Sequence, residues 1–357
     1  MKLLVTGGAG FVGSSLVKLF KQENPNSTIH VFDNLKRRGS ELNLREFKKL
    51  GVEFFHGDIR NPSDLEDLNS NYDYILEASA EPSVHAGTAG QSPKYLLDTN
   101  LNGTLNLLEF GRKHSGGMLF LSTSRVYSIP AIKKIQLEEE ATRFKVSEKQ
   151  DITGISSAGI SEQFPTVGSG FRSLYGTTKL ASELFLEEYS QNLKYPTIIN
   201  RCGVIAGKGQ FGKTDQGVFT LWVARHYFQG KLSYTGFGGE GKQVRDILHP
   251  KDLYRCIAKQ IDQSKSWNSE VFNLGGGDEG SISLQEYTSI CEEVTGKQIS
   301  ISKNPETADV DIPYYVSDSS KAKERFGFEI MMKPKDIVKE IKDWISENEK
   351  ELKTLFS

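Results

Sequence analysis

Tyr175 and Lys179 stand four residues apart in a segment with helical periodicity, LYGTTK at 174–179. Residues at this spacing share one face of a helix. An ammonium close to a phenol favours the phenolate, which lets Tyr175 act as a general base near neutral pH. Thr123 follows a predicted strand at 117–122, and its hydroxyl can hydrogen-bond the same substrate group. A tyrosine–lysine pair alone is common, so its meaning depends on the elements that position it.

Short β-branched runs alternate with helical patterns through the first two hundred residues. This alternation predicts an α/β fold, a doubly wound parallel sheet with helices on both faces. The strands are predicted at 2–6, 28–32, 52–55, 73–77, 117–122 and 196–200. The helices between them are predicted at 11–23, 41–49, 91–114 and 175–192.

Three glycines follow the first strand at a spacing of three, Gly7, Gly10 and Gly13. Gly7 permits a tight turn, Gly10 lets backbone N–H groups approach a pyrophosphate, and Gly13 lets the helix pack closely on the strand. Such a turn is a weak signal alone, but here it lies between a strand and a helix, as a dinucleotide site requires. Phe11 and Val12 belong to the same turn.

Acidic residues end the next two strands. Asp33 comes 20 residues after Gly13, where a carboxylate can accept hydrogen bonds from the adenosine ribose. It would repel a 2′-phosphate, which favours NAD over NADP, although Lys36 and Arg37 can soften this preference. Asp58 follows the third strand and can meet the adenine amino group. The alternative for both acids is a turn or capping role.

The composition is that of an ordinary globular protein. Of 357 residues, 37% are hydrophobic and 25% charged, and the net charge of −2 gives no reason to expect nucleic acid or an acidic membrane as partner. Three scattered cysteines have no metal-ligand spacing, so free thiols and no metal are expected. No apolar stretch reaches the roughly 20 residues of a membrane span, and no signal peptide is recognised, so a cytoplasmic location is expected.

These motifs together resemble the extended short-chain dehydrogenase/reductase family of nucleotide-sugar epimerases and dehydratases. The resemblance covers essentially the whole chain. It implies that NAD stays bound through turnover, that Thr123, Tyr175 and Lys179 form the catalytic triad, and that the helices at 91–114 and 175–192 build a homodimer or homotetramer. The residues that carry it are the glycine turn, Asp33-Asn34, Asp58-Ile59, Asn100-Leu101-Asn102-Gly103-Thr104, Thr123, Tyr175 and Lys179.

The resemblance also implies two sets of binding residues. The cofactor set is Gly7, Gly10, Phe11, Val12, Gly13, Asp33, Asn34, Lys36, Arg37, Asp58, Ile59, Ala78, Ser79, Ala80, Asn100, Ser122, Tyr175, Lys179, Arg201 and Val204. The substrate set is Thr123, Ser124, Gln216, Gln243 and Arg245. In this set Arg245, predicted in a glycine-rich loop, would grip the diphosphate; the alternative is a surface arginine. Where the family has His-x-Ala-Gly after the fourth strand, this chain has Glu77-Ala78-Ser79-Ala80.

The implied domain organisation has two parts. Residues 1–200 are predicted to form the NAD-binding Rossmann domain, with a long irregular insertion at 129–172. Residues 201–357 are predicted to form mainly a smaller nucleotide-sugar-binding domain, whereas 245–262 return to the first domain. Helices are predicted at 216–229, 250–262, 284–295 and 335–348.

The residues after Thr123 bear on the reaction type. Dehydratases of the family carry an acid there to expel water, but this chain has Ser124 and Arg125, which favours epimerisation through a transient ketone. The long stretch between Thr123 and Tyr175 resembles the branch of the family that epimerises CDP-sugars at C2. The segments at 33–39, 56–61, 214–217 and 241–249 resemble the same branch. The alternatives are a 4-epimerase, reductase or dehydratase for another nucleotide sugar, or a non-catalytic NAD-binding protein, which would not need all three triad residues.

Overall fold

The computed structural model describes residues 1–87, 92–211 and 217–356. The chain divides into two compact units, each built from several segments. The first unit contains Met1–Val126, Ser173–Arg201 and Leu253–Phe272. The second unit contains Tyr127–Arg172, Cys202–Asp252 and Asn273–Ser357.

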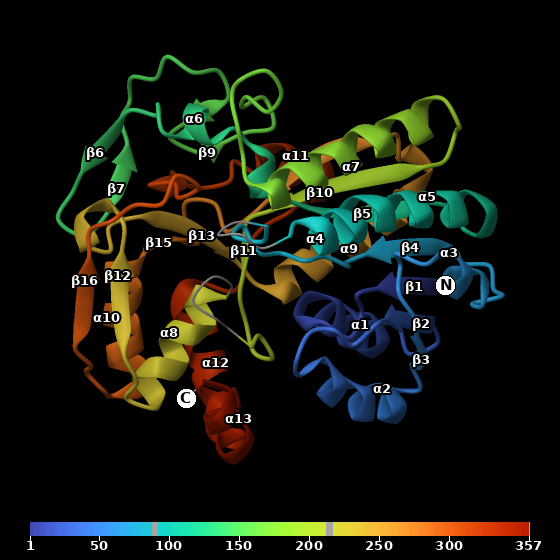
Figure 1. Cartoon of the computed structure of the whole chain (residues 1–357), viewed down its shortest axis with the longest axis horizontal. Helices are drawn as coiled ribbons and strands as arrows, with labels where there is room; N and C mark the ends of the chain where they lie inside the picture. Colours follow the sequence, from blue (N-terminus) through green and yellow to red (C-terminus); the bar gives the residue numbers. More distant parts are fainter. Residues whose placement is uncertain (88–91, 212–216, 357) are drawn as a thin grey trace. The chain divides into compact units, whose positions relative to one another are not determined.

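The central sheet has seven strands in the order β14-β10-β5-β4-β1-β2-β3 (Figure 1). The pairings of β1 with β2 and β4, of β2 with β3, and of β4 with β5 are all parallel. The strand order reverses direction between β1 and β4, and ligands of such sheets bind at the carboxyl ends of the strands beside this switch point. The strands are β1 Lys2–Thr6, β2 Thr28–Asp33, β3 Glu53–His56, β4 Tyr74–Glu77, β5 Met118–Thr123, β10 Thr197–Cys202 and β14 Glu270–Leu274.

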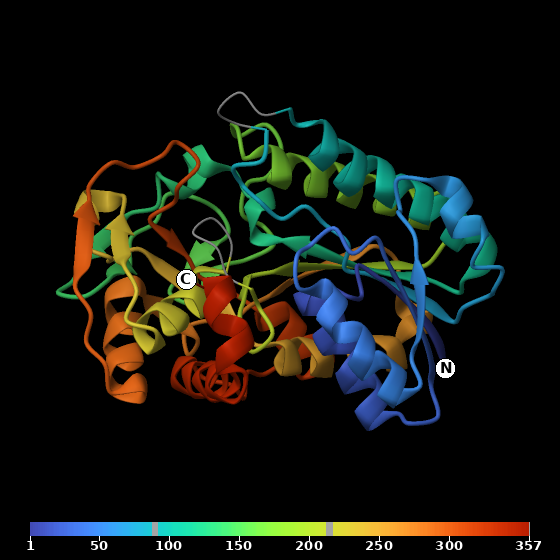
Figure 2. The ribbon, with the colours of Figure 1, turned by 60° about the horizontal axis from the view of Figure 1, so that its bottom comes forward.

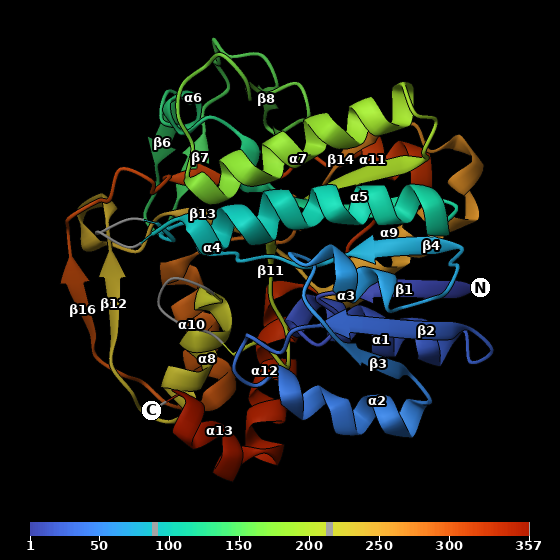
Figure 3. The ribbon, with the colours of Figure 1, turned by 45° about the vertical axis from the view of Figure 1, so that its right-hand side comes forward.

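Helices cover both faces of this sheet, which confirms the doubly wound α/β prediction. The views in Figures 2 and 3 place α5 and α7 side by side on one face. On the other face α1 contacts α9, where the rings of Phe20 and Tyr254 lie 4.8 Å apart. The helices are α1 Phe11–Glu23, α2 Leu44–Leu50, α3 Pro62–Glu66, α4 Lys94–Leu97, α5 Gly103–His114, α7 Leu174–Gln191 and α9 Pro250–Asp262.

The predicted helix at 91–114 is interrupted. A π-helical turn, Asp98–Asn102, lies between α4 and α5. Gly103 follows it, and a Cβ there would lie 2.5 Å from the Ile59 side chain, so this glycine lets α5 pack closely on the loop after β3.

The second unit has its own sheet of β11 Val204–Ile205, β13 Val244–Leu248, β15 Ser281–Ser283 and β17 Tyr314–Tyr315. Its helices are α8 Val218–Tyr227, α10 Leu284–Thr295, α11 Ser320–Phe326, α12 Pro334–Glu347 and α13 Glu349–Phe356, and β12 Leu232–Thr235 pairs with β16 Ile301–Asn304. Buried apolar side chains of α8, α10, α12 and α13 form one core cluster. Among the described helices, none combines the length and apolar character that a membrane span needs.

Two expectations were wrong, and one strand was missed. The insertion at 129–172 is not wholly irregular, because it contains α6 Ile129–Ile132 and the hairpins β6 Leu137–Glu139 with β7 Phe144–Val146 and β8 Ile155–Ser156 with β9 Gly159–Ile160. The loop predicted around Arg245 is strand β13, which pairs with three other strands. Strand β14 of the central sheet was not predicted at all.

The central strands are buried on both faces, as parallel strands usually are. Leu3, Leu4 and Val5 of β1 are fully buried. Burying each such aliphatic side chain contributes about 1.5–3 kcal/mol. Against this background Glu77, the last residue of β4, is unusual because its carboxyl group is also fully buried.

Burial raises the pKa of Glu77 to about 7, although the charge of Lys179 and a hydrogen bond from Thr104 oppose the rise. The folded chain therefore favours the protonated acid more than the unfolded chain does. The resulting stabilisation is complete below the ordinary carboxyl pKa of 4.5 and is lost as the pH rises through about 7.

We therefore expect Glu77→Gln to gain stability relative to the wild type as the pH rises from 5 to 8. The expected relative gain in the free energy of unfolding is on the order of 3 kcal/mol, since the amide never has to ionise in the core. Urea denaturation of both proteins at each pH measures it. Glu66→Gln, at an exposed glutamate of α3, is the matched control. A pH-independent difference between Glu77→Gln and the wild type would contradict this assignment.

Candidate active site

The three predicted triad residues all lie in the first unit. Thr123 is the last residue of β5, Tyr175 lies in the first turn of α7, and Lys179 is one turn further along α7. The helix begins where it does because Ser173 is its N-cap, and the Ser173 hydroxyl accepts a hydrogen bond from the Gly176 N–H at 3.1 Å.

Gly176 brings α7 against the end of β5. A Cβ at this position would lie 2.0 Å from the carbonyl oxygen of Arg125, so any side chain would push the helix away from the turn that follows Thr123. The Arg125 N–H in turn donates to Thr123 Oγ1 at 3.2 Å. Sequence reasoning did not assign Gly176 a role, although its place between Tyr175 and Lys179 was the available signal.

Lys179 is a buried ammonium, with 2% of its surface exposed. Its Nζ lies 4.2 Å from the centroid of the Phe120 ring, a distance at which the ring face attracts a cation. Tyr175 is half-buried, and Thr123 and Ser124 are buried at the strand end. The structure therefore places the three predicted residues on two elements in contact, β5 and α7, and their joint action on a sugar hydroxyl remains a prediction.

The next turn of α7 is fixed by a buried ion pair. Arg201 of β10 donates to Glu183, with 2.6 Å between Nη2 and Oε2, and Ser122 of β5 donates to the same carboxylate. The prediction that Ser122 and Arg201 contact the cofactor remains a prediction, and the structure shows both side chains bound to Glu183. Sequence reasoning missed Glu183, whose signal was an acid four residues after Lys179.

The glycine turn has the tight packing expected of a dinucleotide site. Gly7 has φ +63°, and a Cβ there would lie 2.7 Å from the backbone of Ala78 and Ser79. A Cβ at Gly13 would lie 2.3 Å from the Gly7 carbonyl oxygen. Gly10 is the N-cap of α1, and no side chain caps the first N–H groups of that helix. This arrangement fits a pyrophosphate, because small residues and a helix N-terminus line its approach.

Phe11 and Val12 are the first, half-buried residues of α1. Ala78, Ser79 and Ala80 form the loop that packs on Gly7. These positions agree with the cofactor set without testing it.

Asp33 holds the glycine turn. Its carboxylate accepts hydrogen bonds from the Ala9 N–H at 3.0 Å and from the Leu35 N–H at 2.8 Å. Burial raises the pKa of Asp33, although these backbone hydrogen bonds oppose the rise. The turn role considered for this residue is therefore present, and the ribose role remains a prediction. Lys36 is exposed and Arg37 half-buried in the following loop.

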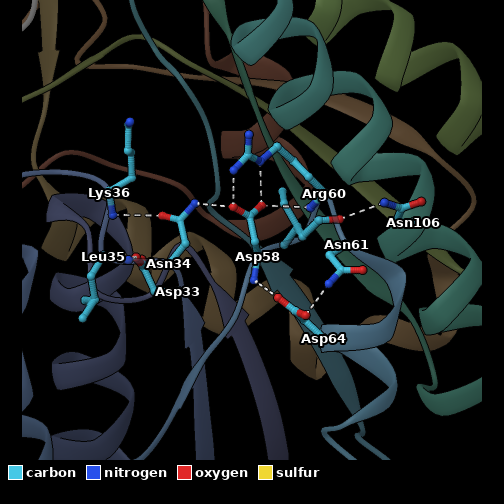
Figure 4. Close-up of polar contacts among 10 residues, drawn as sticks. Asp33, Asn34, Leu35, Lys36, Asp58, Arg60, Asn61, Asp64 and Asn106 are labelled. Carbon is cyan, nitrogen blue, oxygen red and sulfur yellow. Dashed lines mark hydrogen bonds and ion pairs between the residues drawn. The ribbon is translucent and has the colours of Figure 1, made fainter.

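Asp58 is the centre of a polar network (Figure 4). Arg60 donates to both of its oxygens, from Nε at 2.9 Å and Nη2 at 2.6 Å, and Asn34 Nδ2 donates at 2.9 Å. Burial opposes its ionisation, but these hydrogen bonds outweigh that effect and lower the pKa of Asp58 to about 2. Arg60 and Lys36 also lie over the Tyr95 ring. An adenine amino group would therefore have to share the carboxylate with Arg60, which the sequence did not indicate.

Ile59 and Asn100 are held by neighbouring elements. Asn106 of α5 donates to the Ile59 carbonyl at 2.9 Å. The buried Asn100 side chain accepts from the Glu81 N–H at 2.8 Å and donates to the Glu81 carbonyl and to Thr178 of α7. Asn100 thus ties the loop after β4 to α7, and its predicted cofactor contact is untested.

The predicted substrate residues beyond Ser124 belong to the second unit. Arg245 is half-buried on β13 and donates to the carbonyl oxygens of Val244 and Ile312, both at 2.7 Å. Gln243 donates to the Thr235 carbonyl at 3.2 Å, and Val204 of the cofactor set lies on β11. Gln216 lies outside the described residues.

Neither metals nor disulfides are indicated. The described residues contain no cluster of three or more histidine, cysteine or acidic side chains suited to a metal ion. Cys202, Cys256 and Cys291 are buried, and none of them forms a disulfide with another described residue.

Comparison with known proteins agrees with this geometry. The model of the NAD dependent epimerase/dehydratase family matches residues 3–275. CDP-paratose 2-epimerase of Salmonella typhi is 29% identical over 354 residues, which cover 97% of this chain and 99% of that protein. A dTDP-glucose 4,6-dehydratase of Actinoplanes sp. is 28% identical over 303 residues, which cover 83% of this chain and 82% of that protein.

Solved structures share the fold. A UDP-glucose 4-epimerase of Thermus thermophilus in complex with NAD aligns with a TM-score of 0.76 at 22% identity, covering 97% of this chain and 99% of that one. The family match spans most of the chain and includes the glycine turn and the triad. The chain therefore belongs to the NAD-dependent epimerase/dehydratase family, and its cofactor is NAD.

Proposed function

We propose that this protein is a nucleotide-sugar epimerase that converts CDP-paratose to CDP-tyvelose by inverting C2 through a transient keto-sugar. The observation that supports the proposal is that Thr123 ends β5 while Tyr175 and Lys179 lie one turn apart on α7, which packs against this strand, and that Ser124 and Arg125 rather than an acid follow Thr123. The alignment of 97% of the chain with CDP-paratose 2-epimerase supports the choice of substrate.

In this proposal NAD, when bound, supplies the reversible hydride acceptor. Tyr175, as phenolate, takes the proton from the sugar hydroxyl and later returns it. Thr123 Oγ1 shares the hydrogen bond to that hydroxyl and so orients it. Lys179 stabilises the phenolate and holds the nicotinamide ribose. Gly7, Gly10 and Gly13 provide the cradle for the pyrophosphate.

An epimerase is favoured over a dehydratase because loss of water requires an acid beside the leaving hydroxyl. Ser124 is buried next to Thr123, and the following side chain is a guanidinium, which does not donate its proton at physiological pH. The alternative is a 4-epimerase of another nucleotide sugar, since a UDP-glucose 4-epimerase of Pisum sativum is 27% identical over 376 residues. A reductase or dehydratase is less compatible with the strand end.

Substrate recognition is proposed for the second unit. Arg245 supplies a planar guanidinium that suits paired diphosphate oxygens, and Gln243 and Gln216 supply amides for the sugar or the base. In the same proposal residues 1–200 are the NAD-binding domain and 201–357 mainly the nucleotide-sugar domain. The three buried thiols are in keeping with a cytoplasmic location.

The decisive experiment uses CDP-paratose carrying deuterium at C2. We expect CDP-tyvelose that retains the label, formed without added cofactor, because the hydrogen removed from C2 returns to the same carbon. Mass spectrometry and NMR of the product measure retention. Product lighter by one water, or reaction only with added reduced cofactor, would place the protein in another class.

Tyr175→Phe is the matched variant for this assay. It keeps the ring but removes the base, so turnover should fall by about 10²–10⁴-fold while NAD remains bound. Near-wild-type turnover would refute the role of Tyr175.

The bound nucleotide tests the interpretation of Asp33. We expect purified protein to release NAD, not NADP, on denaturation, because a carboxylate beside the adenosine ribose disfavours a 2′-phosphate. Enzymatic assay of the supernatant distinguishes the two. Asp33→Asn should raise the share of NADP, and predominantly NADP in the wild type would contradict the interpretation.

Oligomer formation is part of the proposal, and exposed apolar side chains of α7 support it. Leu184 and Phe185 are 50% and 42% exposed. We expect light scattering at micromolar protein to give two or four times 39.8 kDa. Leu184→Lys should shift the mass towards a single chain, whereas Leu42→Lys, at a leucine 51% exposed outside this helix, should not. A monomeric wild type would refute the expectation.

A further inference from the structure

Glu77 is a buried acid that the proposed reaction does not use. Its backbone pairs with Thr6 of β1 on one side and with Phe120 of β5 on the other. Directly paired residues of parallel strands point to the same face of the sheet, so these three side chains share one face. The Lys179 ammonium lies over the Phe120 ring on this face, and Thr104 of α5 donates to Glu77 Oε1 at 2.7 Å.

The hydrogen bonds of Glu77 are incomplete. Its Oε2 is buried and accepts no hydrogen bond from any residue that the structure describes, and the same holds for the neighbouring hydroxyl of Thr6. A buried carboxylate with one hydrogen bond is costly to ionise unless a cation lies close to it.

Among the described residues, the charge found to act on Glu77 belongs to α7. From α7, Lys179 acts on it electrostatically. The contacts from the other packed elements are uncharged, namely Thr104 of α5, Thr6 of β1 and Phe120 of β5. The next acid along α7, Glu183, is already bound to Arg201. Lys179 and Glu77 are therefore the opposite charges of this face.

We propose that Glu77 is a positioning residue that balances the charge of Lys179. The stabilisation of the Tyr175 phenolate by Lys179 then depends on whether Glu77 is protonated. The inference rests on the proposed roles of Tyr175 and Lys179. When Glu77 is protonated, the full charge of Lys179 acts on the phenol. When Glu77 is ionised, its negative charge offsets part of that effect.

This coupling broadens the pH range over which Tyr175 is a base. Burial places the ionisation of Glu77 near neutral pH. As the pH falls, Glu77 becomes neutral and Lys179 holds the phenolate more strongly, at the point where Tyr175 would otherwise take up a proton. As the pH rises, Glu77 ionises and Lys179 stabilises the phenolate less, but the phenol then loses its proton more readily to the solution.

The test follows the ionisation of Tyr175 by ultraviolet difference titration of the NAD-containing protein, without sugar. Subtracting the same titration of Tyr175→Phe isolates this one phenol. In Glu77→Gln the charge of Lys179 is never offset, so the midpoint of the Tyr175 titration should move to lower pH by about one unit. This shift corresponds to about tenfold more phenolate on the acid side of the transition.

A second variant makes the test independent of Glu77→Gln folding. Thr104→Val removes the hydrogen bond that favours the ionised acid, so Glu77 stays neutral over a wider pH range. The Tyr175 midpoint should then move in the same direction by a smaller amount. Glu66→Gln, at the exposed glutamate of α3, is the control and should superimpose on the wild type.

Unchanged Tyr175 midpoints in folded Glu77→Gln, or in Thr104→Val if the first variant does not fold, overturn the inference. If the Tyr175 midpoints are unchanged but CDP-paratose is epimerised normally, the role of Glu77 is refuted and the proposed function stands. The expected shifts without any turnover of CDP-paratose support the role of Glu77 and refute the proposed substrate.

Discussion

The close contact between the backbone of α7 and the turn after β5 is the constraint on which the candidate site depends. Gly176 meets the Arg125 carbonyl, and this contact fixes how near Tyr175 and Lys179 come to Thr123. About two turns later the ion pair of Glu183 with Arg201 attaches the same helix to β10. Removing one partner of a buried pair typically costs about 3–5 kcal/mol, so this second attachment of the helix is strong.

The two buried acids at described strand positions, Asp246 and Glu77, are stabilised in different ways. Asp246 of β13 accepts hydrogen bonds from the backbone N–H groups of Ser317 at 3.0 Å and Gly277 at 3.3 Å. Burial raises its pKa, and these contacts oppose the rise. Glu77 has only the Thr104 hydroxyl as a described hydrogen-bond donor. The backbone thus stabilises one acid within the second unit, whereas a side-chain charge does so for the other within the first.

Much of the first unit could be predicted because its determinants are local. Buried parallel strands appear in the sequence as apolar runs, and the six predicted strands agree with the structure to within two residues. Gly7 and Gly13 were informative because their spacing reflects a steric requirement. β13 was missed because Arg245 and Asp246 interrupt its apolar pattern, and Asp246 is buried only through contacts from residues about thirty and seventy positions away. The contact of Asn34 with Asp58 and the neighbours of Glu77 were missed for the same reason, since the sequence does not show which side chains meet across elements.

The burial of Lys179 also limits its chemistry with reagents in solution. Most lysines of this chain extend from helices and loops, but the Lys179 amine lies against an aromatic ring with almost no solvent contact. Acylating reagents react with an accessible amine, and the Lys179 amine is not accessible while α7 stays on the sheet. The rate of labelling at Lys179 would therefore report how often the first turns of α7 open. The labelling rate of exposed lysines in the same sample would serve as the reference.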